Sequence, residues 1–548
     1  MVVPRLFWGT CVKRTFISAA AILAFAATAA HADELSDIQL QQKQLREQMT
    51  RRLADLEKRQ KALETQKAAA PTINPVDAMA ADLPYKAAVK ARPAENDDIC
   101  IKGICVYGNF DMGVTWIQHS APFSPLAGGP LDTLVSKNGA GSYFGVGANQ
   151  LSTSFIGLRG KQEIGDNLYA VFNLQTLLNP ASGLNANGTG SIAQNNGLPI
   201  GFQNSFGDSS KGGQMFNNAA YFGISSPTYG TFTMGRQSSL SSDLIVNYDP
   251  LSGSNSWSVI TFQGANGGGG DTENRILDNS YEYRVNVGPV RLAVEAQLSN
   301  GGNSGTNNIF QGDIGFDYMG LSMDFLGGHT SDGISSGVLA VGAIPAVAIG
   351  QGQLAATVSD NTYFQVGARY TIGPWKFFGG YEHIDFTNPN NPLAPGAFLQ
   401  GGFVAGTTNN CNFGGVVGGA CVTKDRILQT AWFGVRYSIT PSLDITGAYY
   451  HEWQNNFAVT AADVTNCTIL GSLASRCSGT LDAVSAVVDW RFAKHMDMYA
   501  GVMWSQVNGG LANGFLGANI AGPTGAANPT PRNSASNVDP GIGLRYQF

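Results

Sequence analysis

The sequence has few charged residues and almost no long apolar runs. Asp, Glu, Lys and Arg make up 13% of its 548 residues, against about 25% in ordinary soluble proteins. Beyond residue 30 the only long apolar run is 338–350, which contains Pro345. It is shorter than the roughly 18 residues that a membrane-spanning helix needs. No helical membrane span is therefore expected, and a set of soluble domains is disfavoured.

Positive charge is also scarce. The formal net charge is −6, and outside residues 43–67 there is no basic run, so a nucleic-acid partner is not expected. The histidines are scattered along the chain, which disfavours an enzyme. We expect no cofactor and no metal site.

Cysteine is rare but regularly spaced. Cys11 lies in a leader segment, and the other six cysteines form close pairs: Cys100/Cys105, Cys411/Cys421 and Cys467/Cys477. No histidine accompanies them, so metal binding is disfavoured. In an exported protein such pairs indicate disulfides. Local pairing is favoured, although six cysteines allow about fifteen connectivities.

The N-terminus indicates export. Arg5, Lys13 and Arg14 precede the apolar stretch 16–30, and Ala30-His31-Ala32 fits a small-x-small cleavage site. Residues 1–32 are therefore predicted to be a signal peptide, with the mature chain beginning near Asp33. A membrane-anchoring helix is the alternative.

Residues 33–66 differ from everything that follows. They are charged and glycine-free, and apolar residues occupy heptad a and d positions: Leu35, Ile38, Leu45, Met49, Leu56 and Leu63. Gln42, Arg52 and Arg59 interrupt this seam. The pattern predicts a short coiled coil, with a solvated single helix as the alternative. An Ala/Pro-rich linker follows at 67–98, and residues 99–548 form the main domain.

From Ile104 onward apolar and polar residues alternate. Val290, Leu292 and Val294, for example, alternate with Arg291 and Glu295. The last strand continues the pattern to the C-terminus, with one face formed by Ile542, Leu544, Tyr546 and Phe548. Strands of about ten residues with period two are typical of transmembrane β-barrel walls.

The connections alternate between short and long. Tight turns occur at 164–167, 226–230, 286–289, 319–320, 372–374, 439–441 and 493–495. Gly/Asn/Ser-rich loops occur at 119–150, 179–215, 239–274, 300–308, 331–360, 387–426, 455–479 and 507–535. Seven turns and eight loops connect sixteen strands, an even number that brings both barrel ends to the short-turn, periplasmic side. A soluble β-sandwich is the alternative, but it should not alternate so strictly.

A four-residue pattern recurs at the end of three predicted strands: Gly367-Ala-Arg-Tyr370, Gly434-Val-Arg-Tyr437 and Gly543-Leu-Arg-Tyr546. The tyrosines are expected to face outward at the lipid interface. The arginines are expected to face inward and to pair with wall carboxylates such as Asp444 or Asp489.

These features resemble the general bacterial porins, the sixteen-stranded trimeric channels of the outer membrane. The resemblance spans about 106–548 and rests on Val106-Tyr-Gly108, Ser154–Gly160 (SFIGLRG), Asn167–Gln175 (NLYAVFNLQ), Tyr221–Gln237 (YFGISSPTYGTFTMGRQ) and the terminal Tyr546-Gln-Phe548. It implies an antiparallel all-β barrel, a homotrimer in outer-membrane lipid, and a final strand, with Tyr546 and Phe548, that the barrel-insertion machinery recognises.

The resemblance also implies which residues narrow the channel. The third long loop, Ser238–Asn274, should fold into the lumen, and the family's loop acids map best onto Asp243 and Asp249. On the facing wall, Phe155, Asn218 and Asn109 stand where the family has basic residues. Arg159 lies within the SFIGLRG motif. Arg236 and Arg275 have the wrong alternation to face inward unless a β-bulge intervenes.

The predicted function is passive diffusion of ions and small hydrophilic solutes through a water-filled channel with a weak cation preference. The coiled coil is expected to extend into the periplasm beneath the trimer, where it could contact peptidoglycan. Two alternatives remain: a substrate-specific porin for sugar or phosphate, with Tyr248, Trp257 and Phe262 as a sugar slide, and an envelope tether in which transport is incidental.

Overall fold

The computed structural model describes residues 43, 47, 52, 99–118, 142–186, 213–261, 275–298, 308–337, 355–387, 398–399, 403–407, 425–455, 478–509 and 534–548. The chain divides into two units, Met1–Asn74 and Pro75–Phe548. In the first unit Lys43, Glu47 and Arg52 are helical and exposed, and the rest of the predicted coiled coil lies outside the described residues. Within the described ranges, no helix combines the length and apolar character needed to cross a membrane.

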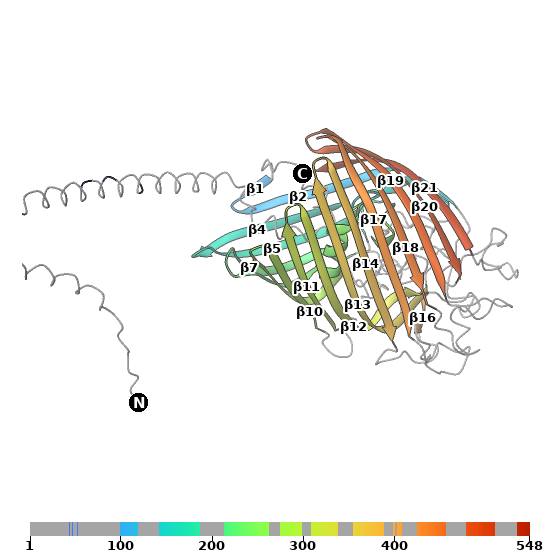
Figure 1. The fold of residues 1–548 in the computed structure, drawn as a ribbon, viewed down its shortest axis with the longest axis horizontal. Coiled ribbons are helices and arrows are strands. Elements are labelled where there is room, and N and C mark those ends of the chain that lie inside the picture. Colours follow the sequence, from blue (N-terminus) through green and yellow to red (C-terminus); the bar gives the residue numbers. More distant parts are fainter. Residues whose placement is uncertain are drawn as a thin grey trace, which may run out of the picture. The chain divides into compact units, whose positions relative to one another are not determined.

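In the described residues of the second unit, the regular structure consists almost entirely of β-strands (Figure 1). In chain order they are β1 (Ile99–Ile101), β2 (Ile104–Ile117), β3 (Tyr143–Ala148), β4 (Phe155–Gly165), β5 (Leu168–Asn179), β6 (Leu184–Asn185), β7 (Ala219–Ser226), β8 (Gly230–Ser238), β9 (Ile276–Val287), β10 (Val290–Gln297), β11 (Ile309–Tyr318), β12 (Leu321–Gly337), β13 (Ala355–Ile372), β14 (Trp375–Thr387), β15 (Phe398–Leu399), β16 (Phe403–Thr407), β17 (Arg426–Thr440), β18 (Leu443–Gln454), β19 (Gly479–Ala493), β20 (Met496–Gly509) and β21 (Ser534–Gln547). Helix α5 (Leu240–Tyr248) and the 3-10 helix η3 (Val259–Thr261) lie between β8 and β9.

Sixteen wall strands form a closed antiparallel barrel. The first wall strand, β2, pairs with the last, β21, from Asn109 opposite Gln547 to Thr115 opposite Gly541. Its other edge pairs with β4 and then with β3, so these two segments together form the second wall strand. Closure leaves every wall strand with a partner on both sides, which is the condition for a sheet to survive in lipid. The predicted sixteen-stranded barrel is confirmed.

Burial follows the predicted alternation. On β13, Tyr363 and Gln365 are buried on the inner face, whereas Phe364 and Tyr370 are 37% and 42% exposed on the outer face. The same holds around the wall: the exposed side chains are large and apolar, and the buried ones include many amides and carboxylates. This inverted distribution is expected when lipid covers the outside and polar groups line the inside.

Most predicted turns are where expected, but several predicted loops contain secondary structure. β3 lies within 119–150, β6 within 179–215, and β15 and β16 within 387–426. The β12–β13 ladder continues to Gly337 opposite Ala355, well into the predicted loop 331–360. Beyond the apolar band of the barrel, a strand needs only backbone hydrogen-bond partners and no alternation of apolar and polar side chains. Ser- and Gly-rich sequence therefore does not end a strand there. The loop predictions were wrong at these positions.

One predicted disulfide is present. Cys100 and Cys105 lie directly opposite each other in the β1–β2 hairpin and are bonded, with their Cα atoms 4.0 Å apart. Lys102 and Gly103 form the turn between them with positive φ angles of 51° and 81°. Cys411, Cys421, Cys467 and Cys477 lie outside the described residues, so their pairing stays a prediction.

Candidate functional site

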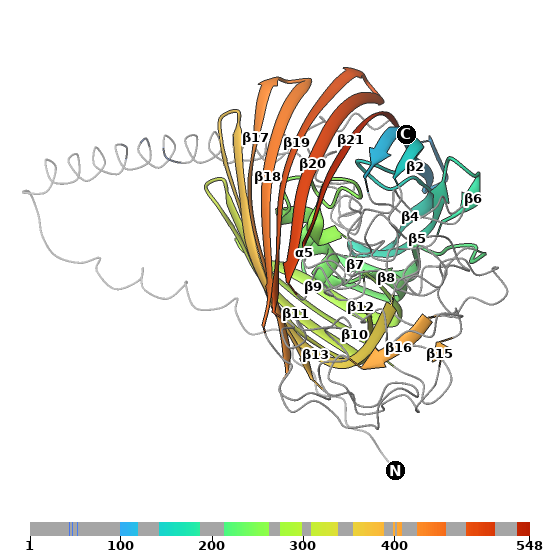
Figure 2. The same ribbon diagram turned by 90° about the vertical axis from the view of Figure 1, so that its right-hand side faces the viewer.

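Helix α5 lies inside the barrel, against the inner wall (Figure 2). Ser239 caps it, since its hydroxyl accepts a hydrogen bond from the Ser242 amide at 3.1 Å. Two more amides of the first turn donate hydrogen bonds to inner-wall side chains. Leu240 N donates to Glu295 on β10 at 3.0 Å, and Ser241 N donates to Gln311 on β11 at 3.2 Å. The amides that every helix leaves unpaired at its start are thus satisfied by inner-wall side chains. This attaches the start of the loop to β10 and β11.

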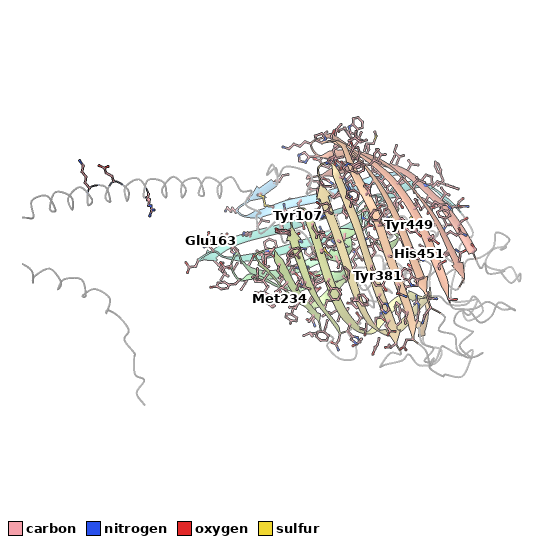
Figure 3. The ribbon with its side chains drawn as sticks, viewed as in Figure 1. Tyr107, Glu163, Met234, Tyr381, Tyr449 and His451 are labelled. Carbon is pink, nitrogen blue, oxygen red and sulfur yellow. A yellow bond between two sulfur atoms is a disulfide. The ribbon has the colours of Figure 1, made fainter. Side chains whose placement is uncertain are left out.

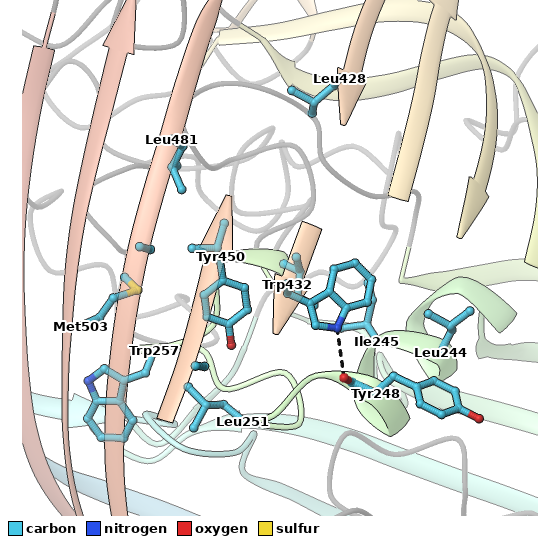
Figure 4. Close-up of a cluster of buried hydrophobic side chains, with 14 of the residues drawn as sticks. Leu244, Ile245, Tyr248, Leu251, Trp257, Leu428, Trp432, Tyr450, Leu481 and Met503 are labelled. Atoms are coloured by element: carbon cyan, nitrogen blue, oxygen red, sulfur yellow. Dashed lines mark hydrogen bonds between the residues drawn. The ribbon is translucent and has the colours of Figure 1, made fainter. Parts of the chain in front are cut away.

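After α5, the chain follows the inner wall through successive strands (Figure 4). The Tyr248 hydroxyl donates to Asp324 on β12 at 2.7 Å, and the Trp432 indole on β17 donates to the Tyr248 carbonyl at 3.0 Å. The Trp257 indole then donates to the Asp539 carbonyl on β21 at 3.1 Å. Residues 239–261 therefore form an inner lining along β10–β21, which we call the lining segment.

The far end of the lining segment meets the break between β3 and β4. The Ser254 hydroxyl donates to the Gln150 carbonyl at 2.9 Å, and the Asn255 amide donates to the Asn149 carbonyl at 2.8 Å. The lining segment is thus fixed at both ends. Nothing in the sequence pattern of 149–150 indicated this role, because the two partners are more than 100 residues apart.

Three inner-wall glycines make room for this packing. A Cβ atom at Gly367 would lie 2.4 Å from the Tyr248 ring, one at Gly434 2.3 Å from Pro250, and one at Gly501 2.7 Å from Trp257. Real Cβ atoms do not approach other atoms so closely. The lining segment reaches the wall only because these positions have no side chain.

The repeated Gly-x-Arg-Tyr pattern provides part of this anchoring. In two of its three copies the arginine donates to a lining-segment carbonyl: Arg369 to Asn247 at 3.3 Å, and Arg436 to Pro250 at 2.7 Å. The third, Arg545, instead pairs with Asp497 at 2.7 Å and Asp489 at 3.3 Å. The expected pairing with wall carboxylates therefore applies to Arg545, whereas Arg369 and Arg436 hold the lining segment.

The two loop acids of the sequence prediction are both buried. Asp249 is 0% exposed and accepts hydrogen bonds from the Tyr450 hydroxyl at 2.6 Å and the Gly253 amide at 2.7 Å. Asp243 forms an ion pair with Arg284. Burial raises the pKa of Asp249, and it raises the pKa of Asp243 to about 7 against the opposing effect of Arg284. Both carboxylates are therefore buried and held by partners within the protein.

Arg236 and Arg275 lie at the base of the loop, and a bulge explains their orientation. The β8–β9 register shifts between Gly235 and Gln237, where Asn279 has a positive φ of 51°. Both arginines are 8% exposed. Arg236 donates to the Asn217 carbonyl at 2.9 Å. The bulge that would be needed to turn them inward is present.

Arg275 is joined to a predicted wall residue, since it donates to the side-chain oxygen of Asn218 at 3.0 Å. The other predicted wall residues lie near the barrel seam. Asn109 is buried and donates to Ser152 and Thr153 at 2.9 and 2.8 Å. Phe155 packs on Tyr107, and Arg159 lies 4.8 Å above the same ring. The structure therefore places the predicted residues in separate groups along the inner face.

The C-terminal strand is held at the seam. Phe548 exchanges backbone hydrogen bonds with Gly108 at 2.9 and 3.1 Å, and its ring stacks on Phe110. Tyr546 points outward and is 42% exposed. Their role as an insertion signal stays a prediction.

Comparison with known families decides the identity of this barrel. The family model described as Gram-negative porin matches residues 19–510. The chain belongs to the Gram-negative porin family. It is an outer-membrane β-barrel, and its family and fold indicate a channel rather than an enzyme.

Solved outer-membrane proteins are similar to this porin at low sequence identity. The anion-selective porin from Comamonas acidovorans is 15% identical, with a TM-score of 0.50 over 81% of this chain and 99% of that one. In-vitro folded OmpT of Vibrio cholerae is 12% identical, with a TM-score of 0.47 over 82% and 100%. No curated protein sequence gives a significant match. The likeness to the solved structures concerns the fold, so charge selectivity has to be argued from this chain's own residues.

Within this porin, sequence reasoning missed the residues that dock the lining segment. Arg369, Arg436 and the glycines two positions before them were visible as a repeat, but their partners were not. In the described part of the chain, no group of three or more His, Cys, Asp or Glu side chains is arranged to hold a metal ion.

Proposed function

We propose that this porin forms a water-filled channel through which ions and small hydrophilic solutes diffuse passively. The observation that carries the proposal is the position of the lining segment. It covers the part of the inner wall that β10–β21 form. The inner faces of β4 and β5 include the polar side chains of Lys161, Asn173 and Gln175. A pore selects by its diameter and by the charge on its walls.

A weak cation preference is part of this proposal, but its basis differs from the sequence argument. The lining-segment acids are engaged in hydrogen bonds and ion pairs. Among the buried charged residues of the described chain, however, carboxylates outnumber arginines, so the preference is based on the net negative charge of the inner face and not on any single carboxylate. Carboxylates near a low-dielectric wall attract cations more strongly than they would in open water.

Reversal potentials in planar bilayers test the preference. With a KCl gradient across the bilayer, we expect the sign that indicates faster K⁺ than Cl⁻ movement. Asp313→Asn removes an inner-wall carboxylate and should reduce the preference, whereas Asp482→Asn on the outer face should leave it unchanged. A reversal potential of the anion-selective sign would refute the charge argument.

We further propose that the porin assembles as a homotrimer and that residues 33–66 form a three-stranded periplasmic coiled coil, which contacts the cell wall. Deleting residues 33–98 should leave conductance unchanged and weaken attachment to peptidoglycan. The sugar-slide alternative loses support because Trp257 and Tyr248 are 0% and 1% exposed and serve as anchors.

A further inference from the structure

The outer face of the barrel carries three histidines at one level. His329, His383 and His451 lie eight residues beyond Leu321, Trp375 and Leu443, the first residues of β12, β14 and β18. Each of these strands follows a short turn, so equal spacing means equal height. Eight residues at about 3.3 Å each, in a strand tilted by about 40°, rise roughly 20 Å above the turns. The apolar band of such barrels is about 25 Å tall, so the histidines lie near its border on the long-loop side.

Two of the histidines are fixed by hydrogen bonds. His451 Nδ1 lies 2.8 Å from Asp482 Oδ1, and the Tyr449 hydroxyl donates to the same oxygen at 2.7 Å. His329 Nδ1 lies 3.0 Å from the Thr362 hydroxyl. Because Nδ1 is engaged in both rings, Nε2 is the nitrogen that remains to bind a group outside the protein.

Aromatic and amide side chains connect the histidines into one surface. His383 stacks on Phe364 with the ring centres 5.2 Å apart, and Phe364 contacts Tyr381 at 5.8 Å. Tyr381 and His451 both contact Trp453, at 6.1 and 5.3 Å. Tyr381, Tyr449 and His451 are labelled on this face in Figure 3. We call the whole surface the histidine belt: His329, Thr362, Phe364, Tyr381, His383, Gln429, Tyr449, His451, Trp453 and Asp482.

The opposite border of the apolar band has a different composition. Near the short turns the outward side chains are aromatic, as in the Trp375–Tyr437 pair with ring centres 4.3 Å apart and the Trp490–Phe492 pair. Among the described residues of that border the single histidine is His495, beside Tyr546. The histidine belt is therefore specific to the border on the long-loop side. It is present there in addition to the aromatic residues that membrane interfaces generally carry.

We propose that the histidine belt binds the phosphate groups of outer-leaflet lipid headgroups. An imidazole donates one N–H when neutral and two when protonated, and phosphate oxygens accept such hydrogen bonds strongly. The belt lies where headgroups begin, on the leaflet that faces the long loops. Three imidazoles spread over β12–β18 can engage several phosphates at once.

The charged and titratable groups facing the histidines include the carboxylates Asp482 and Asp385 and the hydroxyl of Tyr381. Asp482 is occupied by His451 and Tyr449, and it is neutralised as an ion pair when His451 is protonated. Asp385 follows His383 by two residues on the same outward face of β14, and its carboxylate interacts electrostatically with His383 and Asp425. Tyr381 donates its hydroxyl proton to Gln429 at 2.6 Å.

Lipid retention by the full-length protein in detergent micelles tests the proposal. The probe is a diphosphorylated glycolipid, compared with the same lipid lacking phosphate, and bound lipid is counted by native mass spectrometry. The triple variant H329Q/H383Q/H451Q should bind the phosphorylated lipid about tenfold more weakly, and H495Q should bind it like the parent.

Single-channel conductance shows whether the triple variant is correctly folded, since the belt lies outside the lumen. Parental conductance with weakened lipid binding supports the proposal and leaves the channel assignment unaffected. Equal retention by parent and triple variant, or equal binding of the phosphate-free lipid, would overturn it. Displacement of the lipid by equimolar inorganic phosphate would overturn the assignment to a lipid headgroup.

Discussion

Arg545→Met is expected to lower the free energy of unfolding by about 3–5 kcal/mol, because it removes one partner of a buried ion pair. Arg545 is 2% exposed and forms two hydrogen bonds with Asp497, at 2.7 and 2.9 Å. It also lies opposite Asp111 in the ladder that joins the first and last strands. Without the guanidinium, Asp497 loses two charge-assisted hydrogen bonds, and Asp489 keeps a longer contact with Arg491, at 3.9 Å.

Urea unfolding of the refolded barrel in detergent measures this effect. The matched control is Asp482→Asn, which breaks a half-exposed pair on the outer face and should cost less than about 1 kcal/mol. The double variant R545M/D497L should recover part of the loss, since it removes one uncompensated charge. A loss below about 1 kcal/mol for Arg545→Met would show that the seam does not depend on this pair.

Gly367→Ala is expected to displace the lining segment and change the single-channel conductance. The new methyl group would compete with the Tyr248 ring for the same space, since a Cβ atom at Gly367 would lie 2.4 Å from that ring. Overpacking of this kind costs about 1–3 kcal/mol, so Tyr248 should move away from the wall and lose the hydrogen bond that it makes to Asp324. We expect a lower melting temperature and more variable conductance steps.

The control for this substitution is Gly327→Ala on the neighbouring strand β12. A Cβ at Gly327 would meet nothing within 4 Å, so this variant should conduct and melt like the parent. If Gly367→Ala also behaved like the parent, Tyr248 would not be pressed against the wall. The anchoring of the lining segment by the Gly-x-Arg-Tyr repeats would then be contradicted.

The barrel wall could be predicted from sequence because the alternation of apolar and polar residues within each strand depends on that strand's own surroundings. Lipid outside and polar groups inside impose period two on every wall strand, and short turns such as Met319-Gly320 mark the strand ends. The inward orientation of Arg369 and Arg436 followed from the same alternation. Where the strands leave the apolar band, as in β12 beyond Thr330, this constraint disappears, and the prediction failed there.

The path of the lining segment could not be predicted, because it depends on contacts between distant residues. Arg436 and Pro250 meet only after the barrel has closed. Helix α5 is also nearly uniform in burial, since it packs on the wall with most of its surface, and it therefore lacks a clear amphipathic pattern. The bulge at Asn279 was foreseen only as a condition for Arg275 to face inward.

The central claim is that water fills the space between the lining segment and the rest of the inner wall. Planar-bilayer recording of the purified full-length protein tests it most directly. We predict discrete conductance steps that rise in proportion to the bulk salt concentration and that fall when neutral polymers small enough to enter the pore are added. Insertion of the folded barrel without any conductance steps would contradict it.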